Sequence, residues 1–174
     1  MSCGSTKELV EQQWKKPDPG WIKSNSDAAF QENGSSGATA CIIRDEQGQF
    51  KVAQARWYDR ALDVCMMEAL GCRDGLQLAM QQGDLRVALE TDCLELINLW
   101  KKRDAQRSTL GPVLEEINAL SLALHSFSFS YVNRTYNKIA HVLAKQVSKT
   151  HRMEMWHVTP ACVEDLLISE ASAS

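Results

Sequence analysis

A chain of 174 residues, with 44% apolar and 24% charged residues, predicts one soluble domain with a core of ordinary size. Its formal charge of -3 excludes membership of the strongly basic class of proteins that coat nucleic acid. A local basic patch or bound metal ions could still bind a polynucleotide. No stretch approaches the roughly 20 apolar residues that a membrane-spanning helix needs, so we expect no membrane association.

The cysteines predict buried free thiols. None belongs to a CxxC pair and their flanks are apolar, which disfavours a zinc site and fits a reducing compartment. We therefore expect an intracellular protein, with no choice between nucleus and cytoplasm. The six are Cys3, Cys41, Cys65, Cys72, Cys93 and Cys162.

The first sixty residues predict a linker followed by an antiparallel meander. Residues 1–20 are polar and end in KKPDPG, which indicates a linker or an entry turn. Strand-like runs follow at residues 21–30, 38–45 and 50–58, separated by glycine-containing turns.

From Ala61 the apolar residues recur with helical spacing. A helix between two strands implies a right-handed crossover to a parallel neighbour, so we expect an α/β fold with a mixed sheet. The expected domain is 21–150, with 151–174 as a C-terminal tail. The remaining elements are a helix ending near Gly83, a strand at 86–92, helices at 93–103 and 110–124, a strand at 126–133 and a helix at 136–149.

Three carboxylates stand at unusual places. Glu68 lies on the apolar stripe of its helix, where a lone charge needs a partner or a metal; a buried ion pair and an edge position are the alternatives. Asp92 lies where a strand meets a helix, as a ligand-binding residue or as a helix N-cap. Asp27 interrupts the strand-like SNSDAAF, as a metal ligand or in a turn.

If the three carboxylates meet at one end of the sheet, they predict a divalent metal site. Like charges at close range raise each other's pKa, and a divalent cation removes that repulsion. All-oxygen ligation suits Mg²⁺ or Mn²⁺, and two such ions can stabilise the attacking and leaving oxygens of a phosphodiester.

An ordered set of motifs resembles the ribonuclease H-like family, type 1 branch, and more narrowly the plant retroelement-related, reverse-transcriptase-like domains. The match covers roughly residues 14–150. The motifs are WKKPDPGWIKSNSDAAF, GATACIIRDEQGQF, MEALGCRDGLQLA, ALETDCLELI and VNRTYNKIAHVLAK.

The resemblance implies a five-stranded mixed sheet, its first three strands antiparallel, flanked by helices. It implies that Asp27, Glu68 and Asp92 hold two Mg²⁺ or Mn²⁺ ions and that a monomer cuts the RNA strand of RNA–DNA hybrids. Water would attack the phosphodiester and leave a 3′-hydroxyl and a 5′-phosphate. The alternative is a domesticated module, catalytically weak or inactive, that binds nucleic acid or protein.

The chain departs from the family pattern in its last motif. His141 occupies the position of the fourth acid, where it would be a metal ligand or would hold a metal-bound water, or would be a helix histidine without function. The histidine loop of the cellular enzymes is missing, and Arg134 stands there instead as a phosphate contact or a solvated residue.

Substrate contacts are expected from a cluster of basic residues and from the side-chain amides of two asparagines. The cluster KKR would contact the hybrid or would simply form a solvated face. The amides of Asn25 and Asn33 could reach a 2′-hydroxyl. The nucleic-acid-binding prediction comprises Asn33, Lys101, Lys102, Arg103 and Arg134.

Overall fold

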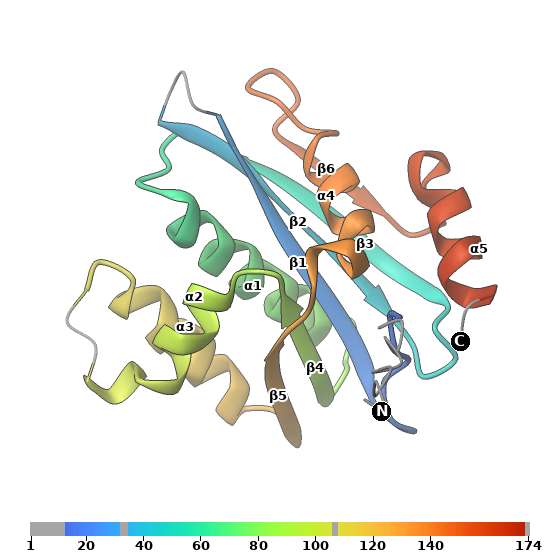
Figure 1. Ribbon diagram of the computed structural model, residues 1–174, viewed down its shortest axis with the longest axis horizontal. Coiled ribbons are helices and arrows are strands. Elements are labelled where there is room, and N and C mark those ends of the chain that lie inside the picture. Colours follow the sequence, from blue (N-terminus) through green and yellow to red (C-terminus); the bar gives the residue numbers. More distant parts are fainter. Residues whose placement is uncertain (1–12, 32–34, 106–107, 173–174) are drawn as a thin grey trace, which may run out of the picture.

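A six-stranded mixed sheet forms the middle layer of the computed structural model, which describes residues 13–31, 35–105 and 108–172 (Figure 1). The strand order is β5-β4-β1-β2-β3-β6. β1, β2, β3 and β6 pair antiparallel in turn, and β4 pairs parallel with both β1 and β5. The strands are β1 (Ile22–Gln31), β2 (Ser36–Arg44), β3 (Phe50–Tyr58), β4 (Arg86–Thr91), β5 (Ser126–Tyr131) and β6 (Met153–Trp156).

Helices cover the two faces of this sheet and bury a core on each. α1, α2 and α3 pack against one face, over a core that includes Ile43, Leu76 and Ile117. α4 and α5 lie toward the other, over a smaller core that includes Ile42 and Leu143 (Figure 1). The helices are α1 (Val64–Gln81), α2 (Leu94–Lys101), α3 (Gly111–Leu122), α4 (Lys138–Ala144) and α5 (Glu164–Ser172).

The α/β class, the antiparallel meander and the sequence of the first five strands and their helices along the chain are as predicted. The sheet has a sixth strand, because Met153–Trp156 pairs with β3 in a segment that we expected to be a tail. α1 begins at Val64 instead of Ala61, since the Asp63 side chain accepts a hydrogen bond from the backbone N–H of Met66 and caps the helix there.

α4 ends at Ala144, five residues before the predicted end of the helix. The chain leaves the helical path through backbone bonds of the i→i−3 type, from Lys145 to Val142 and from Gln146 to Leu143. This tighter turn brings Val147 into the core below α4.

Two glycines allow α1 to approach the sheet closely. A Cβ atom at Gly75 would lie 2.7 Å from the Ser26 hydroxyl oxygen, and one at Gly71 would lie 3.2 Å from the Asp27 carbonyl oxygen. Glycine at these positions therefore sets the distance between the helix that carries Glu68 and the strand that carries Asp27.

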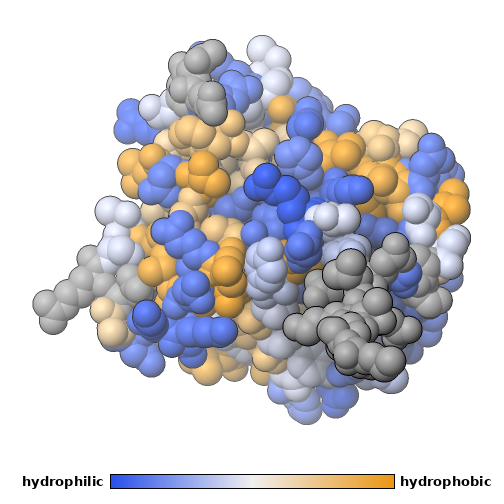
Figure 2. Space-filling view, viewed as in Figure 1, coloured by the Kyte–Doolittle hydropathy of each residue, from blue (hydrophilic) through white to orange (hydrophobic). Residues whose placement is uncertain are grey.

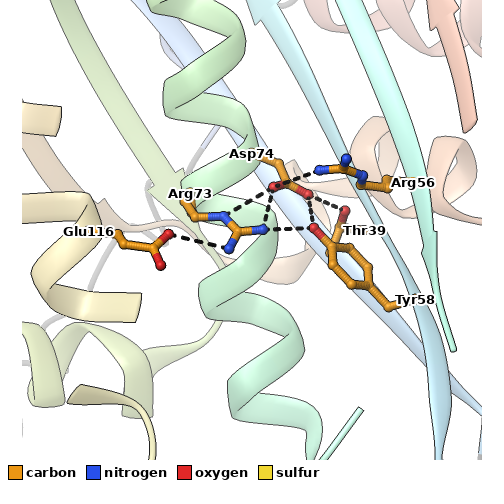
Figure 3. Close-up of polar contacts among 6 residues, drawn as sticks. All are labelled: Thr39, Arg56, Tyr58, Arg73, Asp74 and Glu116. Atoms are coloured by element: carbon orange, nitrogen blue, oxygen red, sulfur yellow. Dashed lines mark hydrogen bonds and ion pairs between the residues drawn. The ribbon is translucent and has the colours of Figure 1, made fainter. Parts of the chain in front are cut away.

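A buried carboxylate ties the middle of α1 to the sheet. Asp74 accepts hydrogen bonds from the hydroxyls of Thr39 (3.0 Å) and Tyr58 (2.6 Å) and forms an ion pair with Arg73 (3.0 Å). Figure 3 shows these side chains around the Asp74 carboxylate, with Arg56 beside it and Glu116 bonded to the far side of Arg73; we name the six residues the Asp74 cluster. The cluster fixes the position of α1 along β2 and β3.

A second buried cluster lies on the opposite face of the sheet. The Arg44 side chain, 1% exposed, forms an ion pair with Glu170 of α5 and donates a hydrogen bond to the side-chain amide oxygen of Asn25 (3.0 Å). Its guanidinium stacks on Trp14, 3.6 Å from the ring centroid. This Arg44 cluster occupies the amide of Asn25, so Asn25 is not available to contact a substrate, contrary to our expectation.

The described cysteines are free thiols. Cys41, Cys65 and Cys72 are buried as expected, whereas Cys93 is half-buried and Cys162 is exposed; Cys3 lies outside the described residues. Within the described ranges, no helix combines the length and apolar character that crossing a membrane requires.

Candidate active site

The fold brings Asp27 and Asp92 side by side at the carboxyl end of β4. Parallel pairing between β1 and β4 ends at Ser26 and Thr91; Asp27 is the next residue of β1, and Asp92 is the first residue after β4. Asp27 also pairs with Ala40 of β2, so it lies within a strand and not in a turn. The Cys93 residue caps α2 and Thr91 accepts from its backbone N–H, so Asp92 is not the N-cap of that helix.

Glu68 completes a compact group of carboxylates. It lies in the second turn of α1, above the point where Asp27 and Asp92 meet. One carboxylate oxygen from each residue lies within 4.8 Å of the others. The Asp27 and Glu68 residues are 3% and 4% exposed, and the Asp92 side chain is 4% exposed. The three residues predicted from the sequence are therefore together and almost removed from water.

Electrostatic repulsion within this group is strong. Burial, together with the charges of Asp27 and Asp92, raises the pKa of Glu68 to about 10. Burial and the Asp92 charge also raise the pKa of Asp27, although His141 opposes the rise. Removing these groups from water without a compensating cation is unfavourable.

The group fits a divalent cation. The Glu68 Oε2 atom is buried and has no hydrogen-bond partner among the described residues, so the ion pair that was the alternative for Glu68 is not formed there. An all-oxygen donor set with an unsatisfied buried oxygen is what a hard cation such as Mg²⁺ or Mn²⁺ requires.

His141, which belongs to α4, lies beside the three carboxylates. Its Nδ1 atom lies 2.9 Å from Oδ2 of Asp27, and half of its side chain is exposed. The nearby Asn137 side chain donates to the Ser26 carbonyl oxygen (2.8 Å) and fixes the start of α4 against β1. Sequence reasoning gave no role to Asn137, although it belongs to the same NKIAH motif as His141.

The residues predicted to contact the substrate lie at different distances from the carboxylates. Arg134 reaches the site, with its Nε atom 3.7 Å from Asp92, while its side chain is 89% exposed. Lys101 and Lys102 are exposed at the far end of the eight-residue α2, about 12 Å along the helix from Asp92. Arg103 is partly buried, because it stacks on Trp100 at 4.2 Å. Asn33 lies outside the described residues.

Comparison with known proteins identifies the family and the fold. The family model described as reverse transcriptase-like matches residues 25–147. No curated protein matches the chain. Among solved structures, the N-terminal RNase H domain of a Mycobacterium tuberculosis protein is 17% identical with a TM-score of 0.66, covering 72% of this chain and 91% of that chain.

Two further solved structures share the fold. RNase H1 from the halophilic archaeon Halobacterium salinarum is 18% identical, with a TM-score of 0.66 and coverage of 72% of this chain and 96% of that chain. LC11-RNase H1, solved in complex with an RNA/DNA hybrid, is 15% identical, with a TM-score of 0.65 and coverage of 72% and 94%.

Proposed function

The chain belongs to the reverse transcriptase-like family, and on that premise we propose that it is a hydrolase that cuts the RNA strand of RNA–DNA hybrids. The observation that carries the proposal is the buried group of Asp27, Glu68 and Asp92, whose oxygens lie within 4.8 Å of one another. The structure of LC11-RNase H1 with an RNA/DNA hybrid, on the same fold, supports the substrate class.

In this proposal the protein residues hold and orient the reacting groups. Asp27, Glu68 and Asp92 would bind Mg²⁺ or Mn²⁺, with two ions as the expected number. When bound, such ions lower the pKa of water and stabilise the attacking and leaving oxygens of the phosphodiester. The burial of the three carboxylate side chains holds them rigidly in place.

His141 has a distinct part in the proposal. Its Nδ1 atom binds Asp27, which fixes the orientation of that carboxylate and leaves Nε2 as the ring atom that can bind a metal or a water. Arg134, exposed and next to Asp92, would contact a phosphate of the substrate. We also propose that a monomer is sufficient, because one chain supplies the three carboxylates, His141 and Arg134.

A second candidate function is a binding module without efficient catalysis. It is favoured by the identity of His141, because imidazole is a poorer ligand than carboxylate for Mg²⁺. The net charge of -3 gives the chain no general attraction for nucleic acid, which favours a module that binds protein.

One assay separates the two functions. The purified protein is incubated with a labelled RNA–DNA hybrid in Mg²⁺, in Mn²⁺ and in chelator. Metal-dependent cuts in the RNA strand support the hydrolase, whereas metal-independent binding without cuts supports the module.

The same assay tests the proposed ligands. We expect Asp27→Asn to reduce cleavage by at least roughly 100-fold, because one of the charges that hold the metal is lost. The control Asp165→Asn removes an exposed carboxylate of α5 and should leave the rate unchanged. Circular dichroism confirms that both variants fold. Cleavage by Asp27→Asn at the native rate would show that the assignment of Asp27 is wrong.

A further inference from the structure

A strip of the sheet beside the carboxylates has no helix packed over it in Figure 1. Side chains at every second position of a strand share a face, so Lys23 and Asp27 of β1 point to the same side of the sheet, the side of α4. α4 packs on β1, β2 and β3. The neighbouring strands β4 and β5 continue this face, with Ala88 in register with Ser128.

Two adjoining hollows run along this strip, with volumes of about 370 Å³ and 420 Å³. They share Lys15, Lys23 and Glu90 in their walls, so they form one channel, which we name the β4–β5 trough. Ser128 and Ser130 of β5 line the first hollow, and both are exposed. Hydrophilic residues (blue to pale) cross the middle of this face in Figure 2.

The far end of the trough meets the carboxylate site. The second hollow is lined by Asn133, which caps the short helical turn Arg134–Tyr136, and by the half-buried Tyr136, which ends that turn. Arg134 in turn lies 3.7 Å from Asp92. A chain lying in the trough would therefore continue directly into the group of three carboxylates.

The charges along the trough favour an anionic occupant. Lys23 and Glu90 neutralise each other through an ion pair of 2.7 Å. Lys15 and Lys16 are exposed, and no acidic partner for their side chains is found in the described part of the chain. Asp18 is the acidic residue that remains in the wall of the first hollow.

We propose that the β4–β5 trough binds an unpaired nucleic-acid strand that continues from the hybrid held at the carboxylates. The inference rests on the proposed function, which supplies the hybrid. Six residues of β5 span about 20 Å, the length of about six stacked nucleotides at roughly 3.4 Å each.

The lining has the chemistry that such a strand needs. Lys15 and Lys16 at one end and Arg134 at the other would contact phosphates, the serine hydroxyls of β5 would bond to sugar or phosphate oxygens, and the Tyr136 ring would offer a surface for a base. Tyr131 and Val132 add apolar surface to the second hollow, but the exposed lysines and serines of the first hollow differ from the apolar centre that a protein partner would call for.

Binding to hybrids with and without extensions tests the inference. The probes are a blunt RNA–DNA hybrid and four versions that carry a six-nucleotide RNA or DNA extension at either end. Fluorescence anisotropy measures Kd with Ca²⁺ in place of Mg²⁺. We expect at least one extension to tighten binding by fivefold or more, and the strand that does so identifies the occupant as RNA or DNA.

Two variants of the full chain place the effect in the trough. Lys15→Gln with Lys16→Gln removes the charges, and Ser128→Glu with Ser130→Glu adds repulsive ones. Both should abolish the gain from the extension and leave the Kd for the blunt hybrid within twofold. Lys145→Gln with Lys149→Gln, a matched change at exposed lysines beyond the trough, should keep the gain. Melting curves verify folding.

The outcomes separate this inference from the proposed function. If no extension tightens binding, or if both trough variants retain the gain, the inference is overturned. Cleavage of the blunt hybrid in Mg²⁺ or Mn²⁺ is scored independently, so its absence counts against the proposed function alone.

Discussion

Glu68 carries a cost that metal binding would remove. Its carboxylate is buried against two others, and Oε2 has no partner among the described residues. The same cost makes the metal-free protein sensitive to pH. The pKa of Glu68 rises from an ordinary 4.5 to about 10 on folding, so the folded state holds the proton more tightly than the unfolded state does.

We predict that the free energy of unfolding in chelator falls as the pH rises from 4.5 toward 10. The stabilising contribution of the protonated Glu68 is complete below its unfolded pKa and is lost as the pH rises through its folded pKa. The slope is at most about 1.4 kcal/mol per pH unit for one group. Glu68→Gln should flatten it in urea denaturation between pH 6 and pH 9.

The exposed Glu116 provides the control for this measurement. Glu116→Gln removes a carboxylate whose side chain is 52% exposed, so the native slope should persist. A slope that is the same in Glu68→Gln as in the native protein would contradict the burial argument.

His141 can be tested by giving the site a fourth acid. We expect His141→Asp to lower the melting temperature in chelator, because a further negative charge would face Asp27. It should also increase the affinity for Mg²⁺, because a carboxylate is a better ligand than imidazole for this hard cation, and we expect a change of about tenfold. Thermal melts at increasing Mg²⁺ measure both effects. Equal stabilisation by Mg²⁺ in the two proteins would rule against a role for His141 at the metal.

The control for His141→Asp is the same substitution at His125. His125 is exposed and its backbone N–H bonds to Leu85, at the end of the sheet away from the carboxylates. His125→Asp adds the same charge without approaching Asp27, so the response to Mg²⁺ should not change.

Sequence patterns identified the three carboxylates but not the residue Asn137, which positions α4 beside them. Glu68 was recognisable because a charge on an apolar helix face needs a partner. A turn for Asp27 and a helix N-cap for Asp92 could be excluded only from the structure, in which the strand register places both residues at the end of β4. Asn137 was missed because its bond to Ser26 joins residues 111 positions apart, which no local pattern encodes.

At the scale of elements, the Asp74 cluster keeps α1 in place on the sheet. The Asp74 residue is 3% exposed and is held by β2 through Thr39 and by β3 through Tyr58 (Figure 3). Glu68 lies on the same helix, so the cluster also fixes where that carboxylate meets β1.

We predict that Asp74→Ala destabilises the fold by about 3 kcal/mol, because it removes the buried acceptor of two hydroxyls and leaves the largely buried Arg73 with only the exposed Glu116 as its ionic partner. Tyr58→Phe, which removes one hydrogen bond to the same carboxylate, should cost about 1 kcal/mol. Urea denaturation in chelator measures both. Glu116→Gln, at the exposed edge of the cluster, should cost less than about 1 kcal/mol. If Asp74→Ala is no more damaging than Glu116→Gln, the cluster does not hold α1.

The element types followed from periodicity, whereas the boundaries depended on side-chain bonds. The helical spacing after residue 60 identified α1, but its start is set by the capping bond of Asp63. β6 has only four residues, and it is a strand because the edge of β3 offers it a partner. So short a run carries no period that a sequence pattern could detect.

At the scale of the molecule, the Arg44 cluster joins segments that are far apart in the chain. Trp14 precedes the sheet, Arg44 ends β2, and Glu170 lies near the end of α5, yet the three side chains meet. The motifs that resemble the family therefore include residues of the scaffold as well as residues of the site. Burial lowers the pKa of Arg44, and Glu170 opposes that change by favouring the charged form.

We predict that removing only one partner of this ion pair destabilises the protein more than removing both. Glu170→Ala leaves a guanidinium that is 1% exposed without a carboxylate, and we expect a loss of about 3 kcal/mol. Arg44→Met together with Glu170→Met replaces the pair by apolar side chains, while Asn25 still accepts from the Trp14 ring N–H at 3.0 Å. The double variant should therefore be more stable than Glu170→Ala in urea denaturation. Glu164→Ala, an exposed change in the same helix, provides the baseline. A double variant less stable than Glu170→Ala would mean that stacking of Arg44 on Trp14, and not its charge pair, connects α5 to the sheet.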